Sequence, residues 1–295
     1  MKMTNNLRVE KATAEDFEKT YPLLLMFNNP KITKTQWQRL FSNYWGFQKE
    51  YCGYKLVHGD EIVGFDAYIF SKKLINGRWE DFCNGSSWIV KPGYRVNSID
   101  LLYPQLDLKD HTITSFSSTI GAYKVETRLL GLKVLDRYEV IIPAIPNWSA
   151  VVKKKFNILS HRRQPRETLV QYLTDYEKKV FQDHEKFDCE HMIITSDQGY
   201  AYLVLKKIHK RHLPFAKLYY ASNLDFFLLH LEELRFRIPL VLNTVGIIVD
   251  SRYLKDKPVS FKKIKYFYMP MLYKSDHLQP HEVDYLYSEF FLLGA

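Results

Sequence analysis

The alternation of apolar and polar residues predicts three consecutive strands in the first half of the chain. The runs at 51–57, 62–70 and 79–90 are rich in Val, Ile, Tyr and Phe. Short polar turns separate them, a His-Gly-Asp-Glu turn at 58–61 and an Asn-Gly pair at 76–77. Because both turns are typical of hairpins, the three strands are expected to form an antiparallel meander.

Other segments with strand or helix periodicity surround this meander. Apolar residues at helical spacing predict four helices. The first follows Thr13, the second occupies 35–44, the third begins at Arg95, and the fourth covers 120–130 and ends at Gly131. Strands are expected at 7–11, 111–117 and 137–142. The order is strand, two helices, meander, helix, strand, helix, strand, which predicts a mixed α/β sheet.

The second half of the chain shows a similar order without a residue-level repeat. A helix is expected from Pro165 to about Val180 and another after Asn223, and strands at 190–195, 200–208, 215–221, 240–249 and 265–273. The basic segment 148–164, which lies between Pro146 and Pro165, reads as a linker. We therefore expect two domains, at 1–147 and 165–295.

Composition excludes several classes of protein. Of the 295 residues, 46% are hydrophobic and 25% are charged, which is typical of globular chains and not of disorder. The three cysteines form no Cys-x-x-Cys pair, which favours free thiols in a reducing compartment over disulfides or a zinc site. The N-terminus is polar, and no apolar run reaches the ~18–20 residues of a spanning helix. A cytoplasmic protein without a membrane span is expected.

The net charge of +9 would favour an anionic ligand, a nucleic acid or a membrane surface, but a well-solvated basic surface is the simpler explanation. The aromatic and basic run at 262–274 resembles a stacking surface for nucleic acid. Its alternation is better explained by packing on a strand, so we do not expect a nucleic-acid partner. The chain has no phosphate-binding Walker loop, dinucleotide-binding glycine motif or His-Glu-x-x-His motif.

Two short motifs, taken with the order of elements, resemble the GCN5-related N-acetyltransferase (GNAT) superfamily. Residues 90–95 read Val-Lys-Pro-Gly-Tyr-Arg, and the family has a Val-x-Pro-x-Tyr-Arg run at the end of its fourth strand. Residues 130–132 read Leu-Gly-Leu, which is similar to the family's Leu-Gly-Phe element. The resemblance covers about residues 7–145. It implies a GNAT-like twisted mixed sheet flanked by helices, and two such domains in tandem.

The resemblance also implies acetyl-CoA or another acyl-CoA as co-substrate, and no metal. In the family, backbone groups of the fourth strand pair with the pantetheine arm, and the loop after this strand holds the pyrophosphate. The residues of this chain at those positions are Trp88, Val90, Arg95, Val96, Asn97 and Ser98.

Two positions depart from the family pattern. Ser98 and Asp100 replace the two glycines of the pyrophosphate loop, and a carboxylate close to a pyrophosphate would repel it. An Asp that caps a free amide at a helix start is the alternative explanation. Thr127 stands where the family often has a Tyr acid, and Tyr123 lies one turn earlier.

Acyl transfer to an amine needs a base for the nitrogen and an acid for the thiolate. The candidate bases are Glu80 and Asp81, which are adjacent on a strand and so point to opposite faces. Both are also explained as a solvated strand end. Ser117, which shares a strand face with Ser115, is a candidate to bind a polar acceptor, and Tyr123 is the candidate acid.

The sequence therefore predicts an acyl-CoA-dependent acyltransferase acting on an amino sugar, a nucleotide sugar or another small polar amine. Two alternatives stay open, a non-catalytic GNAT-like binding module and a transferase of the tandem-GNAT class that uses aminoacyl-tRNA. The sequence does not decide the oligomeric state, and a homodimer is left open.

Overall fold

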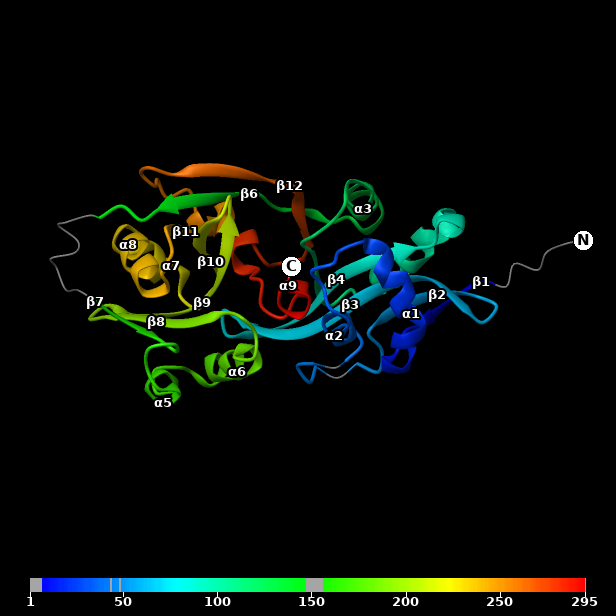
Figure 1. The fold of residues 1–295 in the computed structure, drawn as a ribbon, viewed down its shortest axis with the longest axis horizontal. Coiled ribbons are helices and arrows are strands. Elements are labelled where there is room, and N and C mark those ends of the chain that lie inside the picture. The colour runs from blue at the N-terminus through cyan, green and yellow to red at the C-terminus, as the bar shows by residue number, and fades with distance from the viewer. Residues whose placement is uncertain (1–6, 43, 48, 147–155, 295) are drawn as a thin grey trace, which may run out of the picture. The chain divides into compact units, whose positions relative to one another are not determined.

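The computed structural model describes residues 7–42, 44–47, 49–146 and 156–294. The chain forms two compact units (Figure 1). The first contains the residues up to Leu135, Met269–Gln279 and those from Tyr287 onward, and the second contains Asp136–Tyr268 and Pro280–Leu286. Both are mixed α/β structures, which confirms the predicted fold class.

The sheet of the first unit is built around the predicted meander. Its strand order is β1 (Leu7–Lys11), β2 (Gly53–His58), β3 (Glu61–Ile75), β4 (Arg78–Val90), β5 (His111–Ser115) and β12 (Lys263–Lys274, of which the residues from Met269 onward belong here). The pairs from β1 to β4 are antiparallel, β4 and β5 are parallel, and β12 pairs antiparallel with β5. Asn76 and Gly77 both take positive φ, as a tight hairpin turn requires.

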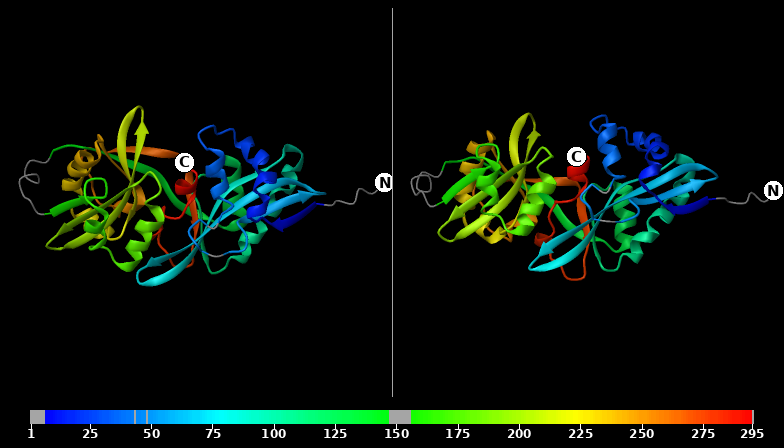
Figure 2. Two further views of the ribbon diagram at one scale, coloured as in Figure 1. Left: turned by 60° about the horizontal axis from the view of Figure 1, so that its bottom comes forward. Right: turned by 90° about the horizontal axis from the view of Figure 1, so that it is seen from below.

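Helices cover both faces of this sheet. They are α1 (Phe17–Leu24), α2 (Lys34–Arg39), α3 (Ile120–Val125) and α9 (Glu289–Leu292), with the 3-10 segments Ala14–Asp16, Leu25–Phe27, Pro92–Leu101 and Tyr103–Asp107. Figure 2 shows α1 (blue) over one face of β3 and β4 (cyan). On this side, Phe65 stacks on Phe41 with ring centroids 4.8 Å apart. On the other face, the Tyr68 hydroxyl donates a hydrogen bond to the carbonyl of Leu101.

Three helices of the first unit differ from the prediction. The helix expected from Arg95 is a 3-10 segment that already begins at Pro92, because proline fits the first helical position. The helix expected at 35–44 ends at Arg39. The helix expected at 120–130 changes into a π-helical turn at Glu126–Leu130. It ends at Gly131 with φ of +70°, as predicted.

The second unit repeats the same pattern of strands. Its order is β6 (Lys133–Pro143, of which the residues from Asp136 onward belong here), β11 (Gly246–Asp250), β10 (Leu213–Ala221), β9 (Gly199–Lys210), β8 (Glu190–Ser196) and β7 (Phe156–Ser160). The strands from β7 to β10 are antiparallel, β10 and β11 are parallel, and β6 pairs antiparallel with β11.

In each unit, the strand beside the parallel pair comes from the opposite half of the sequence. In the first unit β5 is flanked by β12, and in the second unit β11 is flanked by β6. The compact units therefore group the residues differently from the predicted 1–147 and 165–295. Of the predicted linker 148–164, residues 148–155 lie outside the described residues, and Phe156–Ser160 form β7.

The helices of the second unit are α5 (Arg166–Val170), α6 (Asp175–His184), α7 (Leu224–Leu229) and α8 (Leu231–Leu242). The single helix expected from Pro165 to Val180 is interrupted, because Thr174 caps a new helix. Asn223 caps α7, as predicted. The strand expected at 240–249 begins only at Gly246, because α8 continues to Leu242 and ends at Asn243 in the left-handed conformation. None of the helices described here is long and apolar enough to cross a membrane.

The cap at Thr174 gives a first test of the local structure. The Thr174 side chain accepts from the Glu177 amide, and the Glu177 carboxylate accepts from the Thr174 amide at 2.8 Å. We expect Thr174→Ala to lower the free energy of unfolding by about 1 kcal/mol, measured by urea unfolding. Thr174→Ser keeps the hydroxyl and should stay within about 0.5 kcal/mol of the parent. Equal stability of the parent and the alanine variant would contradict the assigned cap.

Candidate functional site

A cleft opens in the first unit where two parallel strands diverge. The pairing of β4 with β5 runs from Asp81 to Asn84 and ends there. Beyond Asn84, β4 stays paired with β3 as far as Val90, so its other edge faces the cleft. The cleft has a volume of about 680 Å³. This volume lies in the range of small-molecule sites, roughly 300–1,000 Å³.

A bulge in β4 shapes one wall of the cleft. The register between β3 and β4 shifts between Phe65 and Ala67, and Ser87 takes φ of +58°. Such bulges re-aim side chains beside functional sites. At the shift lies Asp66, which is buried and accepts a hydrogen bond from Gln105 Nε2 at 3.1 Å. Burial raises the pKa of Asp66 well above its usual value, and the Gln105 hydrogen bond offsets only part of this.

A second carboxylate lies on the opposite wall. Glu126 is the first residue of the π-helical turn, an irregularity that is frequent at functional sites. Its two carboxylate oxygens accept hydrogen bonds from Ser115 Oγ at 2.9 Å and Ser118 Oγ at 2.6 Å. Burial raises the pKa of Glu126, although the two serine hydroxyls favour its charged form.

A third carboxylate comes from the C-terminal helix α9. Glu289 lines the cleft and is only 1% exposed. Ser117 Oγ donates to Glu289 Oε1 at 3.2 Å, and the Glu289 amide donates to Asn84 Oδ1 at 3.0 Å. Burial raises the pKa of Glu289 to about 7, against the lowering effect of the hydrogen bonds from Ser117 and Asn84. In Figure 1, α9 lies beside β4.

Four of the six predicted cofactor-binding residues line the cleft: Trp88, Val90, Arg95 and Ser98. The Trp88 indole donates to the carbonyl of Ser98 at 3.0 Å, which ties β4 to the following 3-10 segment. The Ser98 hydroxyl donates to the carbonyl of Arg95 at 2.8 Å. The Arg95 side chain is exposed, so its guanidinium is available to an anion at the mouth of the cleft.

The other two predicted cofactor residues lie away from the cleft lining. Val96 is 93% exposed. The Asn97 amide lies 3.5 Å from the Asp100 carboxylate as its hydrogen-bond donor. Asp100 is not among the residues that line the cleft. The Asp100 carboxylate, which would repel a pyrophosphate, therefore faces the Asn97 amide and not the cleft.

Of the predicted catalytic residues, Ser117 lines the cleft. The Glu80 carboxylate lies 2.8 Å from His277 Nε2. Asp81 pairs with Lys72 and lines a separate hollow of about 300 Å³. Tyr123 packs against an apolar cluster beside β5. The sequence thus indicated one wall of the cleft, and it missed Asp66, Glu126 and Glu289.

No sequence signal pointed clearly to these three carboxylates. Asp66 interrupts the apolar segment 62–70, which is a weak sign of a buried polar group. Glu289 lies 172 residues after Ser117 in the sequence, so only the fold brings them together.

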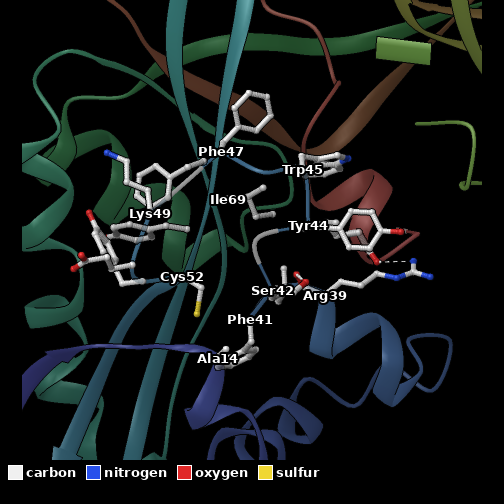
Figure 3. A pocket seen from close by; sticks show the side chains of 16 residues that line it. Ala14, Arg39, Phe41, Ser42, Tyr44, Trp45, Phe47, Lys49, Cys52 and Ile69 are labelled. Carbon is white, nitrogen blue, oxygen red and sulfur yellow. Dashed lines mark hydrogen bonds between the residues drawn. The ribbon is translucent and has the colours of Figure 1, made fainter. Parts of the chain in front are cut away.

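A smaller hollow lies elsewhere in the first unit (Figure 3). It has a volume of about 150 Å³ and is lined by residues that include Arg39, Tyr44, Lys49 and Cys52. Burial raises the pKa of the Cys52 thiol to about 12, so it is no nucleophile near neutral pH. Among the described residues, no group of three or more His, Cys, Asp or Glu side chains could hold a metal ion. These features leave the larger cleft as the candidate site.

Comparison with known proteins gives matches at the level of structure alone. No protein-family model matches the chain, and no curated protein sequence does. A probable N-acyltransferase of unknown function from Enterococcus faecalis V583 matches with a TM-score of 0.60 at 13% identity, over 93% of this chain and 74% of that chain. A GCN5-related N-acetyltransferase from Kribbella flavida matches with a TM-score of 0.59 at 10% identity, over 92% and 72% of the two chains.

A fungal protein extends the set of similar structures. The glucosamine N-acetyltransferase region of a multi-domain β-N-acetylglucosaminidase matches with a TM-score of 0.55 at 12% identity, over 92% of this chain and 38% of that chain. All three similarities span both compact units of the chain and rest on the arrangement of elements, since the identities are low. The predicted resemblance is confirmed at the level of the fold: the chain has the fold of the GCN5-related N-acetyltransferase superfamily.

Proposed function

We propose that the protein is an acyl-CoA-dependent acyltransferase that transfers an acyl group to an amino sugar or another small polar amine. One observation carries the proposal, the cleft between the diverging strands β4 and β5. The exposed edge of β4 beyond Asn84 offers backbone groups to an extended ligand, as an added strand would use them. A pantetheine arm, which has two amides, suits such an edge.

The residues at the mouth of the cleft fit the anionic end of a coenzyme A thioester. Arg95 supplies a guanidinium, which pairs well with phosphate oxygens. Asp100 is directed toward Asn97 and lies outside the cleft lining, so it does not oppose a pyrophosphate there. When bound, the thioester would supply the activated acyl group. Trp88 and Val90 would flank it, and Arg95 would hold its phosphates.

The inner part of the cleft suits a polar, basic acceptor. Three carboxyl groups line it, from Asp66, Glu126 and Glu289. Hydroxyl groups surround them, from Ser86, Ser87, Ser115, Ser117, Ser118 and Thr119. Carboxylates attract an ammonium group, and hydroxyls match the hydroxyls of a sugar. A small amine with several hydroxyl groups is the acceptor class that best uses this lining.

The second unit is proposed to be a divergent GNAT-like domain in tandem with the first. Its antiparallel meander β8–β10 is followed by the parallel strand β11, in the same way as β2–β4 are followed by β5. The site that the proposal uses lies in the first unit.

Ligand-dependent thermal stabilisation tests the proposal. We expect acetyl-CoA or a longer acyl-CoA to raise the melting temperature of the parent protein, because a ligand stabilises the state that binds it. Arg95→Glu should raise the dissociation constant about tenfold to hundredfold, the effect of losing charge-assisted hydrogen bonds. Isothermal titration calorimetry measures this change directly.

Arg78→Glu is the matched control for Arg95→Glu. Arg78 is exposed at the start of β4 and does not line the cleft, so this variant has the same net charge and should bind like the parent. If no acyl-CoA stabilises the parent, the protein does not use this co-substrate and the proposal fails. If both variants bind equally well, the phosphates do not lie at Arg95.

A further inference from the structure

Packing does not explain why a buried carboxylate, that of Glu289, lies against the Ser117 hydroxyl in the cleft. The Glu289 carboxylate is buried, yet its Oε2 atom has no hydrogen-bond partner among the described residues. The other oxygen, Oε1, accepts a hydrogen bond from the hydroxyl of Ser117 at 3.2 Å. A buried charged oxygen without a partner is costly, and such groups in folded proteins call for a functional or solvent-based explanation.

The two side chains differ in their access to the cleft. Ser117 follows the end of β5 and is exposed to the cleft. Glu289 lies behind it, and the hydrogen bond from its amide to Asn84 Oδ1 fixes α9 at the end of the β4–β5 ladder. A molecule in the cleft would meet the Ser117 hydroxyl first, with the carboxylate behind it at hydrogen-bond distance.

Resting on the proposed function, we propose that Ser117 and Glu289 form a proton relay that takes up the proton of the acceptor amine during acyl transfer. The amine nitrogen attacks the thioester carbonyl carbon, so that the C–N bond forms and the C–S bond breaks. The nitrogen gives a proton to Ser117 Oγ as the Ser117 proton passes to Glu289 Oε1. The departing thiolate takes a proton from water, and Glu289 returns its proton to water.

The surroundings of Glu289 favour this direction of proton transfer. The titratable groups that share the cleft with it are Asp66, Glu126 and Arg95. From α2, Arg39 donates to the carbonyl of Leu292 at 3.2 Å, within the same short helix as Glu289. Burial sets the pKa of Glu289 near 7, more than these charges do. A base is most effective when its pKa lies near the working pH.

The test compares the parent with Glu289→Gln in the 295-residue chain. The assay follows thiol release from acetyl-CoA with a panel of primary amines that includes glucosamine. We expect kcat to fall about 10²- to 10⁴-fold, the range for a lost acid or base, with the dissociation constant for acetyl-CoA unchanged. In the parent, log kcat should rise with pH up to about pH 7. In Glu289→Gln this rise should be absent.

Ser117→Ala provides a second readout that a merely structural role would not produce. Removing the hydroxyl removes a hydrogen bond that favours the charged carboxylate, so any residual activity should titrate at higher pH than in the parent. The relay is overturned if Glu289→Gln keeps the parent's kcat and pH dependence. If the parent binds no acyl-CoA and acylates no amine of the panel, the proposed function fails, and the relay with it.

Discussion

Replacing Asp250 by alanine is expected to lower the free energy of unfolding of the second unit by about 3–5 kcal/mol. Asp250 is fully buried at the end of β11. Its carboxylate accepts hydrogen bonds from Tyr285 and Arg252 and lies 3.6 Å from Lys217 Nζ. Burial alone would lower the pKa of Lys217, but Asp250, Tyr219 and Glu139 together outweigh burial, so the pKa is raised. Without the Asp250 carboxylate, the buried cations of Lys217 and Arg252 would each lose a negatively charged partner.

Hydrogen exchange in increasing urea measures this effect where it should occur, in peptides from β10 and β11. A local probe is needed because two compact units need not unfold in a single transition. Asp225→Ala is the matched control, since Asp225 is exposed and pairs with Lys255 at 2.8 Å. Its removal should cost less than about 1 kcal/mol. A similar small loss for Asp250→Ala would show that the buried network does not stabilise the unit.

Glu289→Gln is expected to make the first unit more stable than the parent at pH 8, by up to roughly 3 kcal/mol. Burial raises the pKa of Glu289 from 4.5 to about 7 in the folded protein. Between these values the folded state holds more protons than the unfolded state, so the parent loses stability as the pH rises. Above pH 7 the parent has lost this stability completely. The glutamine variant keeps its stability, because glutamine cannot ionise.

Urea unfolding at pH 5 and pH 8 tests this expectation. The difference between Glu289→Gln and the parent should be small at pH 5 and large at pH 8. Glu15→Gln is the control, because Glu15 is exposed in the first helical turn, and it should show no such dependence. A Glu289→Gln variant less stable than the parent at pH 8 would contradict the assigned ionisation. If Glu289→Gln is both more stable and slower in kcat than the parent, Glu289 is a residue that serves activity at the expense of stability.

The meander and the turns could be predicted because their causes are local. Asn76 and Gly77 tolerate the left-handed conformation that a two-residue hairpin needs, so the pairing of β3 with β4 follows from the sequence. Gly131 marks a helix end for the same reason. The motif from Val90 to Arg95 indicated the fold, and the structural similarities support it.

Other local signals were present but were outweighed. The pair Thr174 and Glu177 is a capping box, and it interrupts a helix that apolar spacing alone predicted as continuous. The apolar run that begins at Leu240 suggested a strand, yet its first residues complete α8. A short apolar run does not distinguish a buried strand from the end of a buried helix.

The amino-acid sequence by itself determined the type and order of most elements and one wall of the cleft, including Trp88, Arg95 and Ser117. Turn chemistry and periodicity act over a few residues, so they can be read directly. Only the tertiary structure decided that β12 pairs with β5 and β6 with β11, and that Glu289 contacts Ser117. These pairings join residues far apart in the chain, and a strand's pattern specifies which face is buried, not which partner lies beside it.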